Sequence, residues 1–252
     1  MRNLADHTGN PQDGDNPGLP NSRKISAPLT FQWVRDVEVV LDGSYLIEDL
    51  LPKSGPAVLY GDSGSGKTFL ALELAAAVAM GGEWAGRHVE GGPVIYLCAE
   101  GQSGFRNRLV ALVDADRISR DAPFALIPTA IDLQKTDGEG FESLLATTKE
   151  IAREVGSPAL IVIDTLSKTF GAGSENSDDM VSYVANCERI AEIFDCLTLI
   201  VHHRPKNGEN RGERGHSSLR AGVVASILVE SKLGSTIRTA TTTHKKEGPA
   251  AP

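Results

Sequence analysis

Apolar runs of strand length alternate along this chain with segments of helical periodicity. The strand-like runs span residues 57–60, 94–98, 124–127, 160–163 and 197–201, and each is almost continuously apolar. Helical patterns separate them near residues 67–80, 103–113, 139–155 and 178–194. Continuous apolar strands interleaved with helices are typical of a parallel sheet that helices cover on both faces. The pattern therefore predicts an α/β fold with a mostly parallel central sheet flanked by helices.

Three further segments refine this prediction. Residues 31–51 alternate apolar and acidic positions, which predicts an edge strand and a short turn packed on the core. Residues 226–232 and 236–243, joined by a turn at 233–235, predict a C-terminal antiparallel hairpin. The helix over 67–80 is apolar nearly all round, so we expect it to be buried and to end at Gly81-Gly82.

The two ends of the chain differ in composition from the rest. Residues 1–27 are rich in Asn, Asp, Gly, Pro and Ser and have little to bury, which predicts a disordered arm. The length of 252 residues suits one sizeable α/β domain. We therefore place the folded domain at residues 28–247 and a flexible tail at 248–252.

Charge and cysteine content narrow the classes of function. The formal net charge of −8 argues against binding nucleic acid with the whole surface, although a local basic loop can still do so. Cys98, Cys187 and Cys196 lack the spacing of a disulfide framework or a zinc site, which favours a reducing cytoplasm. The first residues lack an apolar signal core, and no run of eighteen apolar residues occurs. We therefore predict a cytoplasmic protein with no membrane partner.

A phosphate-binding motif lies between the strand at 57–60 and the buried helix. Gly61-x-x-x-x-Gly66-Lys67-Thr68 fits the P-loop pattern, whose glycines let backbone N–H groups turn inward around phosphates. In such a loop the lysine neutralises the β- and γ-phosphates and the hydroxyl that follows binds Mg²⁺. The motif predicts an ATP–Mg²⁺ site. Its expected nucleotide-binding residues are Gly61, Asp62, Ser63, Gly64, Ser65, Gly66, Lys67, Thr68 and Phe69.

Asp164 ends the apolar strand 160–163 and is the second candidate residue. An acid in this place lies at the carboxyl edge of the sheet, where ligands gather in open α/β folds. There it can hold the hydration shell of Mg²⁺ together with Thr68. Thr165 follows Asp164, so the adjacent glutamate that many ATPases use to activate water is missing.

Two further positions at the same edge are candidates for chemistry at the γ-phosphate. Glu100 follows the strand 94–98 and precedes a glycine that leaves room for a ligand, so we expect it to activate the attacking water. His202 and His203 follow the strand 197–201, so one imidazole should face the site and sense the γ-phosphate.

Taken together, five segments resemble the RecA-like ATPases of the plasmid RepA hexameric-helicase group, AAA-type domains of plasmid, phage and bacterial replication proteins. The resemblance covers about residues 45–247. It rests on Gly61–Thr68, Tyr96–Gly101, Ile163–Leu166, Val201–His203 and Arg214–Arg220.

The resemblance implies a role for each matching residue. It implies that Glu100 polarises the attacking water and that His202 or, as we favour, His203 senses the γ-phosphate. It implies that Arg214, with Arg220 as the alternative, is an arginine finger that reaches the neighbouring subunit's nucleotide. It also implies a homo-oligomeric ring, usually a hexamer. The expected catalytic residues are then Lys67, Glu100, His203 and Arg214.

Two loops are candidates to face single-stranded DNA. The loop 204–214 has four basic residues against two acids, which suits a strand threaded through a ring. The loop 170–179 is net acidic, so we expect at most weak binding there. The sequence departs from the resembling family at Gly222–Ala225, where an acidic residue is often present.

Three hypotheses on function follow. The first is an ATP-driven motor, a ring helicase on single-stranded DNA in plasmid, phage or mobile-element replication. The second is a regulatory or recombinase-like ATPase whose nucleotide state controls assembly with a protein partner. The third is a catalytically silent nucleotide-binding scaffold.

Overall fold

The structure is a computed structural model that describes residues 33–36, 45–172, 178–204, 217–231 and 237–246. The chain divides into two compact units, residues 1–41 and 42–252. In the first unit, the described residues form a 3₁₀ helix, η1 (Val34–Asp36), and the Arg35 guanidinium lies 5.3 Å from the centroid of the Trp33 ring. The predicted arm 1–27, the tail 248–252 and the hairpin turn 233–235 lie outside the described residues.

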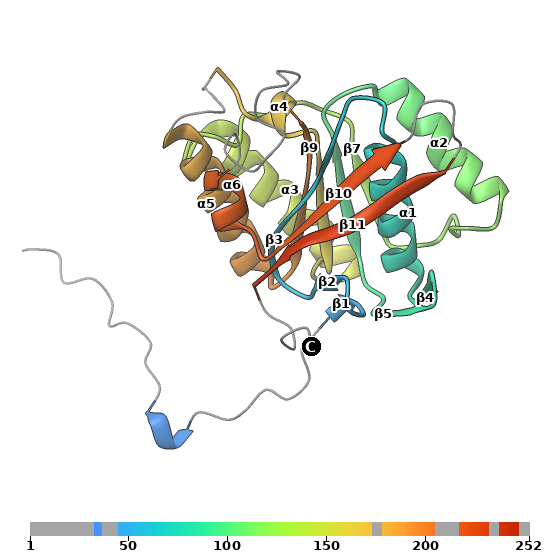
Figure 1. Ribbon diagram of the computed structural model, residues 1–252, viewed down its shortest axis with the longest axis horizontal. Coiled ribbons are helices and arrows are strands. Elements are labelled where there is room, and N and C mark those ends of the chain that lie inside the picture. The colour runs from blue at the N-terminus through green and yellow to red at the C-terminus, as the bar shows by residue number, and fades with distance from the viewer. Residues whose placement is uncertain (1–32, 37–44, 173–177, 205–216, 232–236, 247–252) are drawn as a thin grey trace, which may run out of the picture. The chain divides into compact units, whose positions relative to one another are not determined.

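The second unit contains a sheet of seven strands within the described part of the chain (Figure 1). Their order across the sheet is β11-β10-β3-β9-β8-β6-β7. The strands are β3 (Gly55–Gly61), β6 (Val94–Cys98), β7 (Phe124–Ile127), β8 (Leu160–Asp164), β9 (Leu197–His203), β10 (Ala225–Ser231) and β11 (Arg238–Lys245). Every neighbouring pair is parallel except β10 and β11, which are antiparallel. The predicted parallel sheet and C-terminal hairpin are both confirmed.

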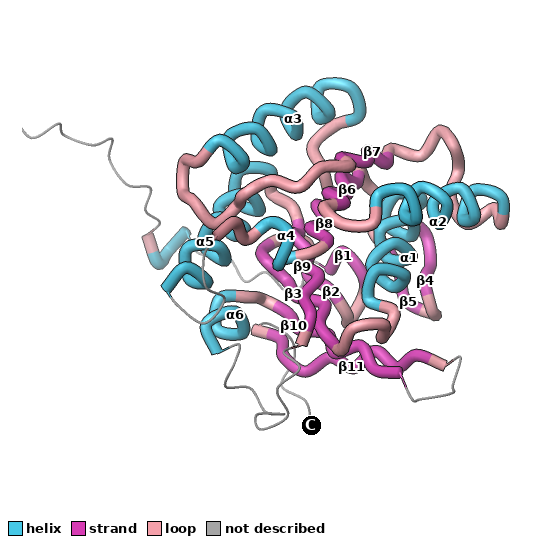
Figure 2. The backbone as a smooth tube through the Cα atoms, turned by 90° about the horizontal axis from the view of Figure 1, so that it is seen from above, coloured by secondary structure: helices cyan, strands magenta, loops and turns pink. Residues whose placement is uncertain are grey.

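Helices cover both faces of this sheet (Figure 2). They are α1 (Lys67–Met80), α2 (Gln102–Asp114), α3 (Glu139–Val155), α4 (Leu166–Thr169), α5 (Asp178–Phe194) and α6 (Ser217–Gly222). The first two lie on one face and the other four on the opposite face. The helical periodicity in the sequence predicted the four longer helices, α1, α2, α3 and α5, to within one residue at each end. It did not indicate α4 and α6, which are too short to show a period.

The core consists of two apolar clusters, one on each face of the sheet. Leu72, Leu74 and Phe105 belong to the cluster beneath α1 and α2, where their side chains are at most 2% exposed. Phe141 of α3 and Tyr183 of α5 belong to the cluster on the other face, both 0% exposed. Because strands such as β8 contribute to both clusters, they are apolar along the whole packed run, which in β8 is residues 160–163. This double burial explains the continuous apolar runs in the sequence.

Helix α1 ends where the sequence predicted. Gly81 has φ 67°, a positive value that glycine adopts without strain, and its N–H donates to the carbonyl of Ala77 at 2.8 Å. A side chain at Gly81 would also meet the backbone of Gly91, since its Cβ would lie 3.1 Å from that Cα. The chain can therefore turn sharply away from the buried helix.

Four short strands form a second, antiparallel sheet in the described residues. They are β1 (Tyr45–Ile47), β2 (Leu51–Pro52), β4 (Gly82–Trp84) and β5 (Arg87–Val89), in the order β2-β1-β5-β4. Leu46, Ile47 and Val89 pack into the apolar cluster under α1. The edge strand predicted within residues 31–51 thus exists as β1, but it pairs with β5 and β2 and does not extend the central sheet. Strands of two or three residues satisfy few hydrogen bonds and leave no clear period in the sequence.

Candidate active site

The register of the central strands brings the predicted site residues to one edge of the sheet. Gly61 at the end of β3 is paired with His203 at the end of β9. Asp164 at the end of β8 is paired with Val201 on one side and Cys98 on the other. The carboxyl ends of the parallel strands β3, β9, β8 and β6 therefore meet side by side, as ligand sites in open α/β sheets require.

The loop after β3 has the backbone that a phosphate cradle needs. Gly64 and Gly66 have φ 77° and 97°, which residues with a side chain rarely adopt. Gly61 is held by close packing, because a Cβ there would lie 2.2 Å from the carbonyl oxygen of Val229 in β10. The glycines of the motif are thus required by geometry at three separate positions.

Lys67 lies inside this loop and is 3% exposed. Its Nζ donates to the carbonyl oxygens of Gly61 at 3.0 Å and Asp62 at 2.7 Å, so the ammonium group is held within the cradle. Burial lowers the pKa of Lys67, while the charges of Asp164 and Asp62 act in the opposite direction. The lysine therefore lies within the loop, where its charge can neutralise a bound phosphate.

Ser65 contributes a polar atom that the protein itself does not satisfy. Its hydroxyl is buried, the residue is 1% exposed, and Oγ has no hydrogen-bond partner among the residues that the structure describes. An unsatisfied buried hydroxyl costs stability unless a ligand or water pairs with it. Its place in the cradle fits a polar ligand such as a phosphate.

Asp164 is buried, 3% exposed, beneath the loop. Burial raises its pKa, while hydrogen bonds from Tyr96 and Thr68 and the charge of His203 favour the ionised carboxylate. The Tyr96 hydroxyl donates to Asp164 Oδ2 at 2.7 Å. Thr68 and Asp164, which the sequence predicted as metal ligands, are therefore neighbours at this edge of the sheet.

Tyr96 is a site residue for which the sequence predicted no role. It lies within β6, is fully buried, and has Phe105 at 4.4 Å and Phe124 at 6.1 Å between ring centroids. Burial and the neighbouring Asp164 raise its pKa well above the usual value, so the phenol remains protonated and can donate. In the sequence Tyr96 resembles any aromatic strand residue, and its partner lies 68 positions away.

Glu100 follows β6 and is exposed. The Cys98 thiol donates to its carbonyl oxygen at 3.2 Å, and Gly101, with φ 66°, begins the turn into α2. The Glu100 charge is close enough to raise the pKa of both Asp164 and His203. A solvent-exposed carboxylate beside the buried Asp164 is suitably placed to contact a water molecule at a bound nucleotide.

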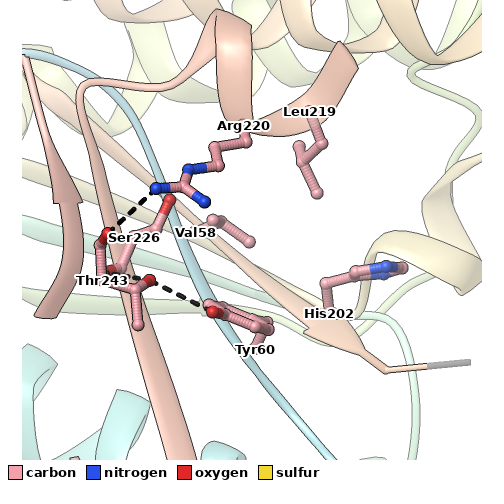
Figure 3. A pocket seen from close by; sticks show the side chains of 7 residues that line it. All are labelled: Val58, Tyr60, His202, Leu219, Arg220, Ser226 and Thr243. Atoms are coloured by element: carbon pink, nitrogen blue, oxygen red, sulfur yellow. Dashed lines mark hydrogen bonds between the residues drawn. The ribbon is translucent and has the colours of Figure 1, made fainter. Parts of the chain in front are cut away.

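The two histidines lie on opposite faces of β9. His203 is partly exposed on the nucleotide side, and burial and the Lys67 charge lower its pKa, against the effects of Glu100 and Asp164. His202 is 1% exposed and lines a small cavity of about 50 Å³ on the other face, together with Tyr60, Arg220 and Ser226 (Figure 3). His203 stays the predicted sensor, because it faces the phosphate loop whereas His202 faces away from it.

Of the two candidate arginine fingers, Arg220 lies within the described part of the chain. Arg214 lies outside the described residues. Arg220 lines the cavity in Figure 3, and its Nη2 donates to the carbonyl oxygen of Thr243 at 3.2 Å. Arg220 is therefore tied to β11 of its own chain, which does not suit a finger that reaches a neighbouring subunit.

Two basic side chains that the sequence did not predict as site residues lie beside the phosphate loop. The Arg108 guanidinium of α2 lies 4.6 Å from the ring centroid of Phe69, whose side chain is 58% exposed at the start of α1. Arg238 of β11 lies against Gly66. Neither arginine is near the motif in sequence, so no local pattern could have indicated it.

These residues fit a magnesium nucleotide. A glycine cradle with an inward ammonium group suits phosphates, and the oxygens of Thr68 and Asp164 are the hard ligands that Mg²⁺ prefers. Within the described ranges, no group of three or more His, Cys, Asp and Glu side chains forms a metal cluster. Mg²⁺ does not need one, because it is usually held by one or two carboxylates, substrate phosphates and water.

Fold and site together define a RecA-like P-loop ATPase. Comparison with protein families gives the same class, because a family model described as "AAA domain" matches residues 30–209. The chain belongs to this AAA-domain family, which supports nucleotide binding and ATPase activity.

Solved structures share the fold at low sequence identity. A KaiC-like protein from the hyperthermophilic archaeon Pyrococcus horikoshii OT3 is 14% identical with a TM-score of 0.56, over 83% of this chain and 89% of that one. A second solved structure, an ATPase domain, is 12% identical with a TM-score of 0.59, over 78% and 79%. No curated protein sequence matches the chain. Among the described helices, none has the length and apolar character to span a membrane.

Proposed function

We propose that this chain is an ATP–Mg²⁺-dependent motor that acts on single-stranded DNA as a RepA-type ring helicase in plasmid, phage or mobile-element replication. Family membership supports the ATPase. The DNA substrate, the ring and unwinding are the proposed part, and they extend the resemblance of the site residues to that helicase group.

Each site residue has a defined task in this proposal. The backbone N–H groups of the loop and the Lys67 ammonium group bind the phosphates. Thr68 and Asp164 would hold Mg²⁺, which would neutralise negative charge during transfer of the γ-phosphoryl group to water, with ADP as the leaving group. Glu100 orients the attacking water and accepts its proton. His203 contacts the γ-phosphate and changes its contacts once that group is released.

One observation carries the proposal that ATP turnover drives movement of DNA. The backbone N–H of Arg204 donates to the carbonyl oxygen of Gly61 at 2.9 Å, and its guanidinium lies 5.9 Å from the Tyr60 ring centroid. Arg204 is the first residue of the basic loop 204–214 that we expect to face DNA. The start of that loop is therefore hydrogen-bonded to the first residue of the phosphate loop, which supports coupling between nucleotide state and the loop, whose residues 205–214 lie outside the described residues.

The ring follows from the proposed role of Arg214. An arginine finger supplied in trans is worth about 10³–10⁵ in rate, so an isolated subunit should be nearly inert. Mixing Lys67→Ala subunits with Arg214→Ala subunits should then restore part of the activity, because some interfaces combine an intact cradle with an intact finger. Absence of any rescue would argue for a site complete within one chain.

Stimulation of ATPase activity by DNA tests the motor directly. We expect single-stranded oligonucleotides at low salt to raise the rate of phosphate release, and the increase to fall as salt rises. Lys67→Ala should show no activity with or without DNA. An ATPase rate that single-stranded DNA leaves unchanged would favour the regulatory or recombinase-like alternative, in which nucleotide state controls assembly with a protein.

Assembly is measured separately, by mass in solution. The proposal predicts a ring in the presence of ATP–Mg²⁺ and a short oligonucleotide. A monomer under these conditions would contradict it.

A further inference from the structure

We propose that Arg238 of β11 binds the α- and β-phosphates of the nucleotide held by the phosphate loop of its own chain. The inference rests on the proposed nucleotide binding and adds a residue that the P-loop motif does not contain.

The hairpin brings Arg238 to the loop through strand register. β10 runs parallel to β3, and the carbonyl oxygen of Val229 packs against Gly61 so closely that no Cβ fits between them. β11 returns antiparallel to β10, with Arg238 opposite Ser231. The first residue of β11 therefore lies beside the loop, at the same edge of the sheet as the strand ends that form the site.

The part of the motif that Arg238 adjoins is Gly66. A Cβ built on this glycine would lie 3.4 Å from Arg238 Nε, 3.5 Å from Cδ and 3.6 Å from Cγ, which is ordinary van der Waals contact. The stem of the arginine thus lies along the last glycine of the motif. The residue is exposed, and its Nη1 donates to the carbonyl oxygen of Ile237 at 3.3 Å.

The charge and place of Arg238 select the phosphates as its ligand. A guanidinium group offers several N–H donors in a planar fork that matches phosphate oxygens. The backbone N–H groups of a P-loop cradle the α- and β-phosphates, whereas its lysine extends to the β- and γ-phosphates. Arg238 adjoins a glycine of the loop that cradles the α- and β-phosphates, whereas Lys67 extends toward the γ-phosphate. We therefore assign Arg238 to the α- and β-phosphates.

Calorimetric titration of ATP and ADP into the full chain tests this inference. Arg238→Gln retains much of the stem and removes the charge, and we expect it to weaken binding of ATP and ADP by a similar factor of about ten. Arg238→Lys should bind with intermediate affinity. Arg153→Gln, an exposed arginine in the last turn of α3, is the matched control and should bind as the wild type does.

Several results would overturn the assignment. Wild-type affinity of Arg238→Gln would do so, as would a loss confined to ATP, which indicates a γ-phosphate contact. A changed preference between ATP and GTP would indicate contact with the base. Melting of the nucleotide-free variants checks folding, and if Arg238→Gln does not fold, Arg238→Lys must still show weakened binding of both nucleotides.

Failure of this inference can be distinguished from failure of the proposed function. If the wild type binds ATP, Lys67→Met does not, and Arg238→Gln binds as well as Arg153→Gln, only the role of Arg238 is wrong. If the wild type binds no nucleotide, the proposed function itself fails.

Discussion

The hydroxyl of Tyr96 donates a 2.7 Å hydrogen bond to Asp164 Oδ2, and both residues are buried in the centre of the sheet. The bond joins the strands β6 and β8, which are neighbours in the sheet. The Thr68 hydroxyl lies close enough to Asp164 to favour the ionised form of the carboxylate that we propose holds Mg²⁺, while Tyr96 orients it. A partner that orients a ligating carboxylate commonly affects metal affinity as strongly as a ligand does.

Replacing Tyr96 by Phe should therefore weaken the response to Mg²⁺. The ring and its packing against Phe105 are kept, but the orienting hydrogen bond is lost. We expect the Mg²⁺ concentration for half-maximal ATPase activity to rise about tenfold, while kcat at saturating Mg²⁺ stays near wild type. Tyr183→Phe is the control, because it loses a buried hydrogen bond of equal length, 2.7 Å to Thr169. An equal shift in both variants would show a general structural effect.

His203 should make the nucleotide-free protein less stable in mild acid. Because burial and the Lys67 charge lower its folded pKa, the unfolded chain takes up the proton first as pH falls. The stability that the neutral imidazole contributes is fully present above about pH 6.5, the pKa of an unperturbed histidine. It is lost as the pH falls through the lower pKa that His203 has in the folded protein. Denaturant unfolding across this range should show a smaller acid loss for His203→Asn. His88→Asn, an exposed histidine on β5, should retain the wild-type profile, and identical profiles for all three proteins would contradict the prediction.

Two glycines of the phosphate loop should respond differently to alanine. At Gly61 the new Cβ would lie 2.2 Å from the backbone oxygen of Val229, so β10 must move, and we expect a loss above about 3 kcal/mol in the free energy of unfolding. At Gly64 the space around the Cβ is open and φ is 77°, so only backbone strain of about 1–2 kcal/mol opposes the change. Chemical denaturation measures both. Equal losses would show that the packing between β10 and the loop is not as described.

Lys67 should link nucleotide binding to stability. Binding to the folded state raises stability by about 2.7 kcal/mol when the ligand is at 100 times its dissociation constant. Thermal melting of the wild type should therefore shift upward with ATP–Mg²⁺, and Lys67→Met should lose this shift. A shift of wild-type size in Lys67→Met would place the nucleotide elsewhere.

The sequence predicted the features whose residues are neighbours in the chain. The segment from Gly61 to Thr68 carries its chemistry in eight consecutive positions, and Asp164 and Glu100 follow strands that continuous apolar runs identify. Tyr96 and Arg238 could not be found in this way. Tyr96 resembles a core aromatic residue and Arg238 an exposed edge residue until the sheet order places them beside Asp164 and Gly66.

The same limit on prediction applies to the small antiparallel sheet and to the two histidines of β9. Strands such as β1 and β5 have three residues each, too few for a periodic pattern, so only the pairing of distant segments reveals them. His202 and His203 are adjacent, and their alternation across β9 is predictable from any strand. The nucleotide is expected on the face of the sheet that α1 covers. The sequence alone does not show which of the two histidines faces α1, because this depends on how the helices pack on the sheet.

Phosphate release by Glu100→Gln, measured beside ATP binding, tests the central claim that this site hydrolyses ATP with Glu100 as the activating carboxylate. Glutamine keeps the size of the side chain but cannot accept the proton of the attacking water. We predict ATP affinity near wild type and a turnover rate reduced by at least about 100-fold. Turnover at the wild-type rate in Glu100→Gln would contradict the account.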